Sequence, residues 1–337
     1  MTIKDLAVKT GYAVGTVSRV LNNHPNVSEK ARTAILQAVE ESGFQLNVNA
    51  KQLKQSHATS ILVVVKGTGN ELFAEMIETI QNLIAQTRYP LYVDYMDEEE
   101  NEVLRAIRLC REKKPLGIIF LSGSSHNFRE DFDKIDIPSV LVTVDASGLG
   151  FDHLSSVYTD DVQASKQATD HLVDLGHRRF AAIGGPRDFS DTSRLRYEGL
   201  MRSFREHGIE FDPELDYETV RFSFQGGYQG AKNLIEKGRQ FTALVAASDV
   251  MAIGAIRALW DCGIQVPRDV SVVGFDGLPL GSYQVPRLTT VEQAAVPMAR
   301  RAVEILLECV EQGGAAVHEA IPFHLHFRES TRRIDCK

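Results

Sequence analysis

From Ser60 onward, short apolar runs alternate with longer stretches in which apolar residues recur at helical spacing. This alternation predicts parallel β-sheets that are covered on both faces by helices. The predicted strands fall into two groups, Ile61–Val65, Leu91–Tyr95, Gly117–Leu121, Val140–Val144 and Ser156–Tyr158, then Arg179–Ile183, Tyr217–Phe222, Ala243–Ala247 and Ser271–Phe275. The predicted helices are Leu72–Gln86, Asn101–Lys113, Asp161–Leu175, Ser193–His207, Gln225–Glu236 and Val250–Cys262. We therefore expect two doubly wound lobes around a cleft, because ligands bind beyond the carboxyl ends of parallel strands.

The last part of the chain is predicted to return to the first lobe. A strand around Leu288–Val291 and a helix at Met298–Glu311 follow the second group of strands. We accordingly predict that the first lobe comprises residues 59–159 and 289–318, and that the second lobe comprises residues 160–288 and 319–333.

The first 45 residues have a different pattern, with three short helical segments. Thr2 and Asp5 have the spacing of a capping box, and Gly11 ends the first helix. A second helix at Val14–Leu21 follows a tight turn, and a third begins at Ser28, a good N-cap residue. This spacing is typical of helix-turn-helix domains, so the segment is predicted to form a DNA-binding headpiece.

Many residues of the headpiece occur in a register that is typical of one protein family. They are Ile3-Lys4-Asp5-Leu6-Ala7, Gly11, Thr16-Val17-Ser18-Arg19-Val20-Leu21-Asn22, Val27-Ser28 and Arg32. With them the chain resembles the lactose/galactose repressor family of bacterial transcription regulators. Later landmarks include Leu175-Gly176-His177-Arg178-Arg179, Val272-Val273-Gly274-Phe275-Asp276 and Pro286-Arg287-Leu288-Thr289-Thr290-Val291, so the resemblance covers essentially the whole chain. It implies an all-α helix-turn-helix headpiece followed by an α/β two-lobed body like a periplasmic sugar-binding protein, with two doubly wound parallel sheets.

The resemblance also implies which headpiece residues contact DNA. By position they are Thr2, Val14, Gly15, Thr16, Ser18, Arg19 and Asn22. Arg19 is the natural guanine reader because its planar guanidinium matches O6 and N7 together, although taken alone it is equally a solvated helix-face charge. Val17 and Val20 are expected to pack in the core. Ala13 stands where relatives usually have a serine N-cap, and we therefore expect the isolated headpiece to be marginally stable.

Residues 46–58 match the hinge helix of the family. Asn47, Ala50 and Leu53 are its expected DNA contacts, with Leu53 as a wedge in the minor groove. A helix this short is unstable alone in water. Without DNA we expect a polar linker.

In the body, residues 59–333, the resemblance implies an effector site between the lobes. Its expected residues are Phe73, Arg196, Phe222, Ser248, Asp276 and Gln293. The chemistry suits a polyhydroxylated ligand, because a carboxylate accepts hydroxyl protons, a guanidinium donates two parallel bonds and a phenyl ring covers a sugar face. Taken singly, the phenylalanines are also ordinary core residues and Asp276 a turn cap. Lys66 follows the first strand and is either a contact for an anionic effector or, as we prefer, a surface lysine.

Composition and charge agree with a DNA-binding regulator. The 337-residue chain has a net charge of −8, yet residues 1–57 carry seven basic and four acidic side chains. An acidic body therefore accompanies a basic end that meets phosphate. The four cysteines lack paired or zinc-like spacing, which favours reduced thiols in the cytoplasm. There is no signal peptide or membrane-length apolar run.

No catalytic constellation is recognisable, and we expect no cofactor and no metal. Gly184-Gly185-Pro186 lacks the dinucleotide and P-loop patterns. His324 and His326 alternate on a strand and share a face, so a metal pair is one interpretation and two surface histidines the preferred one. A sugar-modifying enzyme or hydrolase with an accessory DNA-binding domain is the alternative function. The preferred expectation is a cytoplasmic repressor, a homodimer or a higher oligomer, that binds palindromic double-stranded operator DNA under control of a small effector, most readily a sugar.

Overall fold

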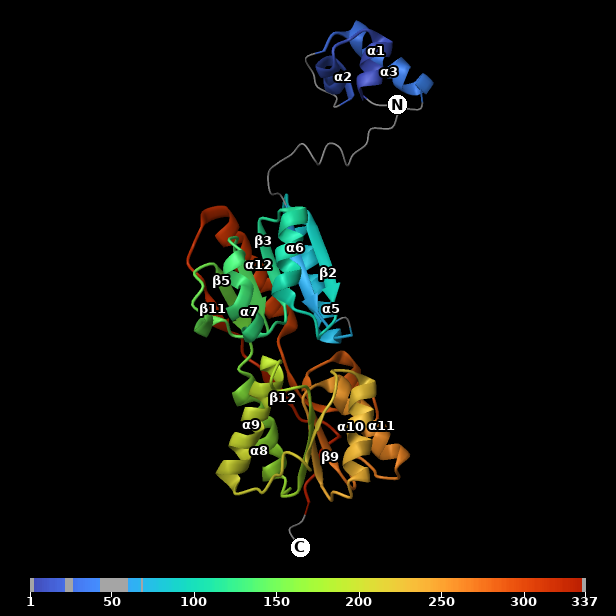
Figure 1. Cartoon of the computed structure of the whole chain (residues 1–337). Helices are drawn as coiled ribbons and strands as arrows, with labels where there is room; N and C mark the ends of the chain where they lie inside the picture. The colour runs from blue at the N-terminus through green and yellow to red at the C-terminus, as the bar shows by residue number, and fades with distance from the viewer. Residues whose placement is uncertain (1–2, 22–26, 43–59, 68, 335–337) are drawn as a thin grey trace. The chain divides into compact units, whose positions relative to one another are not determined.

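The computed structural model describes residues 3–21, 27–42, 60–67 and 69–334. The chain divides into two compact units, Met1–His57 and Ala58–Lys337. The smaller unit contains the predicted helices α1 (Ile3–Thr10), α2 (Val14–Leu21) and α3 (Glu29–Ser42). Figure 1 shows these helices packed together at the amino-terminal end of the chain.

The three helices of the small unit share one apolar core. Leu6, Val17 and Ile35 are fully buried in it, one from each helix. Gly11 has a φ of +71°, a left-handed conformation that glycine adopts without strain where α1 ends. Ala13 has no polar side chain that could cap α2. The helix begins with the Thr16 N–H, which donates to the Ala13 carbonyl. Helical periodicity therefore predicted this unit correctly.

The larger unit consists of two six-stranded sheets, as the alternating pattern predicted. The first sheet has the order β11-β5-β4-β3-β1-β2, and its strands are β1 (Ile61–Lys66), β2 (Leu91–Met96), β3 (Gly117–Leu121), β4 (Ser139–Val142), β5 (Leu154–Tyr158) and β11 (His318–Ala320). The second has the order β12-β10-β9-β8-β6-β7, and its strands are β6 (Phe180–Gly184), β7 (Tyr217–Thr219), β8 (Ala243–Ala246), β9 (Ser271–Asp276), β10 (Thr289–Glu292) and β12 (His324–His326). Neighbouring strands pair in parallel in both sheets except β10 and β12, which are antiparallel.

Helices cover both faces of each sheet (Figure 1). The first lobe has α5 (Glu71–Ile84), α6 (Glu102–Lys113), α7 (Ser125–Asp131) and α12 (Ala295–Gln312), and the second has α8 (Asp161–Asp174), α9 (Asp191–His207), α10 (Phe224–Glu236) and α11 (Asp249–Asp261). Ile61, Val63 and Val65 face α5 and α12, whereas Leu62 and Val64 face α6 and α7. Because a strand presents alternate residues to opposite faces, this double burial explains the continuous apolar run of β1.

One predicted strand belongs to the other lobe. The strand expected around Leu288–Val291 in the first lobe is β10, which pairs with β9 in the second sheet. Leu288 and Val291 are fully buried in the two cores of that lobe. The chain returns to the first lobe only with α12, and β11 then pairs with β5 before β12 re-enters the second sheet. Either sheet offers an edge to a short apolar strand, and the strand's own sequence does not decide which one it joins.

Candidate functional site

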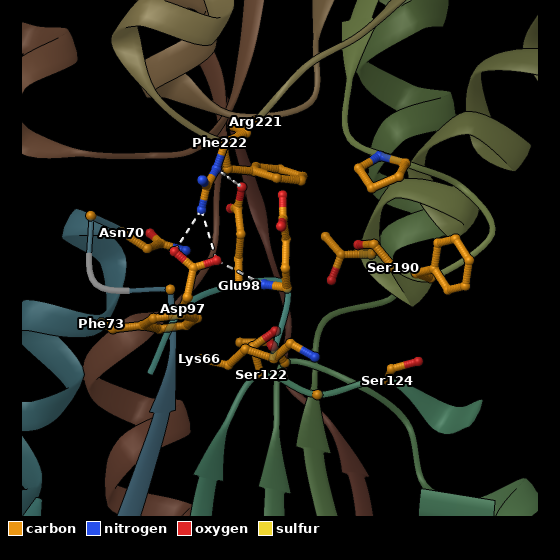
Figure 2. Close-up of a pocket in the computed structure, with 18 of the residues that line it drawn as sticks. Lys66, Asn70, Phe73, Asp97, Glu98, Ser122, Ser124, Ser190, Arg221 and Phe222 are labelled. Carbon is orange, nitrogen blue, oxygen red and sulfur yellow. Dashed lines mark hydrogen bonds and ion pairs between the residues drawn. The ribbon is translucent and has the colours of Figure 1, made fainter. Parts of the chain in front are cut away.

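A cavity of about 840 Å³ lies between the two lobes. Residues at or just after the ends of β1, β2, β3 and β4 form one side of it, and residues at or just after the ends of β6, β7, β9 and β10 form the other. Figure 2 shows side chains from both lobes pointing into this space, among them Lys66 and Ser122 from the first lobe and Ser190 and Phe222 from the second. The cavity thus occupies the position that the doubly wound topology predicts, beyond the carboxyl ends of the parallel strands.

Arg196 is the central cation of the second-lobe wall. It lies on α9 and is only 5% exposed. Its Nε donates to Asp161 Oδ1 at 2.8 Å, and its Nη1 donates to the Ala247 carbonyl. Its guanidinium also lies over the Phe275 ring, with Cζ 3.6 Å from the ring centroid. These contacts fix the orientation of the Arg196 side chain.

Asp276 is the buried carboxylate of the same wall. Its Oδ1 lies 3.4 Å from Arg196 Nη1 and accepts a hydrogen bond from Gln293 Nε2 at 2.9 Å. The residue has a φ of +119°, which an L-residue rarely adopts, at the end of β9. Burial raises the pKa of the Asp276 carboxyl to about 6, while Arg196 opposes this shift.

A second buried carboxyl group lies next to Asp276. Asp249 is fully buried, and it accepts from the Thr290 hydroxyl and from the Leu278 backbone N–H. Burial and the charge of Asp276 hold the pKa of Asp249 well above its usual range. The two carboxyl groups therefore disfavour each other's ionisation, and Asp276 is the one that lines the cavity.

Gln293 carries an acceptor without a partner. The side chain is 3% exposed and lines the cavity, and its Oε1 has no hydrogen-bond partner in the described residues. A buried unpaired acceptor costs free energy, roughly 1–3 kcal/mol. A hydroxyl or amine of a ligand in the cavity would satisfy this atom.

The first-lobe wall combines an aromatic ring with a paired lysine. Phe73 is 3% exposed on α5 and lines the cavity. Lys66 donates to Glu102 Oε2 at 2.5 Å, and the Glu102 side chain is completely buried. Glu102 also accepts the Ser124 N–H at 2.6 Å. Lys66 is therefore not the free surface lysine that we expected, because its charge is balanced by a buried carboxylate.

The cavity mouth has polar residues that the sequence pattern did not indicate. Arg221 donates through Nε to Glu98 at 2.6 Å and through Nη2 to both oxygens of Asp97, at 2.8 and 2.9 Å (Figure 2). The strand predicted at Tyr217–Phe222 ends at Thr219 in the structure. The next three residues, Val220, Arg221 and Phe222, line the cavity instead. Asp97 and Glu98 directly follow β2, and the position after a parallel strand is the one signal in the sequence that could have placed them at the cavity.

Five of the six expected effector residues line one cavity. They are Phe73, Arg196, Phe222, Asp276 and Gln293. Ser248 does not line it: its hydroxyl accepts the Met251 N–H and caps α11, and the residue is 1% exposed. Serine is a preferred N-cap, and this local hydrogen bond accounts for the hydroxyl.

The expected DNA contacts lie partly within the described residues. Val14, Gly15 and Arg19 are exposed on α2, and Thr16 is half-buried there. Ser18 lies on the same helix. Thr2, Asn22, Asn47, Ala50 and Leu53 fall outside the described residues, as does the whole of the expected hinge, residues 46–58. Val17 and Val20 are buried, as the core interpretation predicted.

Of the two histidines that the sequence places on one face of the last strand, His326 pairs with a carboxylate. His326 on β12 contacts the carboxylate of Glu292 on β10. Over the described ranges, no group of three or more His, Cys, Asp or Glu is placed to hold a metal ion. Cys110, Cys262 and Cys309 are free thiols. None of the described helices combines the length and apolarity that a membrane span requires.

Both units match known protein families. Residues 2–47 match the model of bacterial regulatory proteins of the lacI family, and residues 169–331 match a periplasmic binding protein-like domain. The chain is 35% identical to the HTH-type transcriptional regulator MalR of Clostridium butyricum over 339 aligned positions, which cover 99% of this chain and all of that protein.

Solved structures show the same fold. The lac repressor dimer bound to operator and the anti-inducer ONPF has a TM-score of 0.73 and 24% identity, over 98% of this chain and 99% of that one. The complex of the transcriptional regulator CelR with cellobiose has a TM-score of 0.71 and 25% identity, over 98% and 99%. The headpiece, the two-lobed body and the full-length similarity to MalR agree, and the chain belongs to the lacI family of bacterial regulatory proteins.

Proposed function

We propose that this DNA-binding transcription regulator is a repressor whose affinity for operator DNA is controlled by a neutral sugar bound between the lobes. The observation that carries the proposal is the set of oriented polar groups on the second-lobe wall. Arg196 and Asp276 are held by other residues of that lobe, and Gln293 presents an unsatisfied acceptor beside them. A ligand with several adjacent hydroxyl groups matches fixed donors and acceptors of this kind.

The charges of the cavity favour a neutral ligand over an anionic one. Lys66 pairs with Glu102, Arg196 with Asp161 and Asp276, and Arg221 with Asp97 and Glu98. Every lysine and arginine that lines the cavity is therefore already neutralised. A phosphate or carboxylate on the effector would have to compete with these carboxylates. A sugar uses only the donor and acceptor positions that these paired side chains leave free. CelR, a structural neighbour, is known in complex with cellobiose.

On the DNA side, Val14, Gly15, Thr16, Ser18 and Arg19 are the proposed contacts within the described residues. The exposed guanidinium of Arg19 is the proposed guanine reader. Thr2, Asn22, Asn47, Ala50 and Leu53 complete the proposed set by their positions in the sequence.

A dimer is part of the proposal because the operator is expected to be palindromic. The segment around the 3₁₀ turn Pro279–Ser282 exposes Leu280 by 39%, Tyr283 by 83% and Val285 by 92%. Several exposed apolar side chains in one segment favour an interface with a second copy. The lac repressor, a structural neighbour, is a dimer when it is bound to operator DNA.

The proposed regulation couples two equilibria. The effector contacts both lobes, so it favours one orientation of the lobes over others. In a dimer that orientation determines the spacing of the two DNA-binding ends, and with it the affinity for a palindrome. The sugar thereby changes operator affinity without touching DNA.

The test uses the full-length chain in two steps. Selection from a random DNA pool should enrich a palindrome, and a gel-shift titration should show that Arg19→Ala loses the preference for it over random DNA. A neutral sugar should change operator affinity, and Asp276→Asn should abolish that response without changing affinity in the absence of sugar. Asp261→Asn is the matched control, because Asp261 lies at the surface on α11 and does not line the cavity. Enrichment of no palindrome, or a sugar response that survives Asp276→Asn, would overturn the proposal.

A further inference from the structure

The cavity lining divides into a buried part and an exposed part. We call Phe73, Arg196, Asp276 and Gln293 the inner subsite, because each of these side chains is at most 5% exposed. We call Asp97, Glu98, Phe189 and Arg221 the outer subsite, because all four also line the cavity but lie toward solvent. The inner subsite has the oriented groups already described. The outer subsite has a different character, because it combines an exposed aromatic ring with two carboxylates that pair with Arg221.

Phe189 provides the apolar surface. It is 70% exposed although it lines the cavity. It lies in the loop between the end of β6 at Gly184 and the start of α9, directly before the N-cap Ser190, whose hydroxyl accepts the Ser193 N–H at 3.2 Å. An exposed aromatic ring that is held at the wall of a ligand cavity is suited to stack on the apolar face of a ligand ring.

Asp97 and Glu98 provide the polar side of the outer subsite. Arg221 binds both carboxylates across the cleft, and Asp97 Oδ1 also accepts the Glu99 N–H at 3.0 Å. These hydrogen bonds, first that from Glu99 and then those from Arg221, hold the pKa of Asp97 below its usual range. Two carboxylates that are held by Arg221 can accept hydroxyl protons, whereas they disfavour an anionic group.

The size of the cavity is sufficient for both subsites to be occupied at once. Its volume of about 840 Å³ lies toward the upper end of the range of ligand pockets, roughly 300–1,000 Å³. A single sugar ring on the inner subsite would leave Phe189 and the carboxylates facing water. A ligand with a second ring would cover them.

We infer that the effector is a neutral carbohydrate of at least two rings, with one ring on the inner subsite and the next stacked on Phe189 beside Asp97 and Glu98. This inference rests on the proposed function, because it specifies the size of the sugar for the same cleft. It assigns Phe189 as a residue that determines specificity for ligand length. The inner subsite supplies binding for any ring, and Phe189 supplies the additional affinity for a longer ligand.

The test is calorimetric titration of the full-length protein with a panel of neutral sugars. The panel contains glucose, galactose, fructose and ribose, the disaccharides maltose, cellobiose, lactose, sucrose and trehalose, and maltotriose. At least one sugar of two or more rings should bind at least tenfold more tightly than each of its component monosaccharides. Phe189→Ala should weaken that sugar roughly three- to tenfold, the range for an aromatic contact, and leave the binding of monosaccharides unchanged.

Phe224→Ala is the matched control, because Phe224 is also an exposed phenylalanine of the second lobe, 40% exposed, but does not line the cavity. It should leave all affinities unchanged. If monosaccharides bind as tightly as every longer sugar, or if Phe189→Ala binds the longer sugar normally, the two-ring inference is wrong and the proposed function stands. If no sugar of the panel binds, both are overturned.

Discussion

Arg221 Nη2 lies 2.8 Å from Asp97 Oδ2, and this ion pair joins the second lobe to the first across the mouth of the cavity. A further connection between the lobes is formed by the Ser125 N–H and hydroxyl, which donate to Asp191 at 2.5 and 3.0 Å. These contacts join the two lobes directly. Effector binding then acts on an equilibrium that these contacts already bias toward closure.

Arg221→Ala is expected to loosen this closure with little effect on global stability. Because both partners of the ion pair are about half exposed, the free energy of unfolding should fall by no more than about 1 kcal/mol. Hydrogen–deuterium exchange should become faster in peptides that contain Asp97–Glu99, since Asp97 loses its partner in the other lobe. Arg202→Ala, which removes an exposed pair with Glu198 within α9, is the control. Unchanged exchange in the Arg221 variant would show that the pair does not hold the lobes together.

Arg196→Ala is expected to destabilise the body as well as to abolish effector binding. The substitution leaves Asp161, fully buried on α8, without its cationic partner, and burial already raises the pKa of that carboxyl. Breaking a buried pair in this way typically costs roughly 3–5 kcal/mol. Urea denaturation at pH 7 measures the loss. The double variant Arg196→Met with Asp161→Asn should recover part of it, and a single variant as stable as the parent would contradict the structural role.

Effector binding is expected to weaken as the pH falls through about 6. Burial raises the pKa of Asp276 to about 6, and only its ionised form accepts two hydroxyl protons. Below that pH, affinity should fall roughly tenfold per pH unit. The folding stability should have the opposite pH dependence. Because the pKa of Asp276 is raised in the folded state, its contribution to stability is present below pH 3.8 and is lost as the pH rises through about 6. Calorimetric titration with the sugar between pH 5 and about 7.5 tests this, and the control Asp261→Asn should show the same pH dependence as the parent.

His177 is expected to make the body less stable in acid. The ring is 1% exposed, with Nδ1 2.9 Å from the Thr242 hydroxyl and Nε2 3.2 Å from the Arg332 carbonyl. Burial lowers the pKa of His177 from 6.5 to about 4, so its stabilising contribution is present above pH 6.5 and lost as the pH falls toward 4. The slope should approach about 1.4 kcal/mol per pH unit in that window. Urea denaturation of His177→Gln should show a shallower slope, whereas exposed His126→Gln should match the parent.

The local sequence of the late strand β10 did not predict the lobe to which this strand belongs. The apolar residues of β10 correctly predicted a buried strand, yet the strand belongs to the second sheet rather than the first. Its neighbour is chosen by contacts of Leu288 and Val291 with residues far away in sequence. In the same way, Ser248 was expected at the cavity by position, but its local hydrogen bond to Met251 turns the hydroxyl into a helix cap.

The sequence by itself determined the elements and the family of this protein. Helical and strand periodicity is a local property of side-chain burial, and the headpiece residues occur in a fixed register that needs no contacts to be recognised. The tertiary structure alone decided the partners of each charge. Lys66 with Glu102, Arg196 with Asp161, and Arg221 with Asp97 are separated by 35 or more positions along the chain. Such pairs form because the fold brings the ends of different strands together, and the energy of an ion depends on burial and partners that no local pattern encodes.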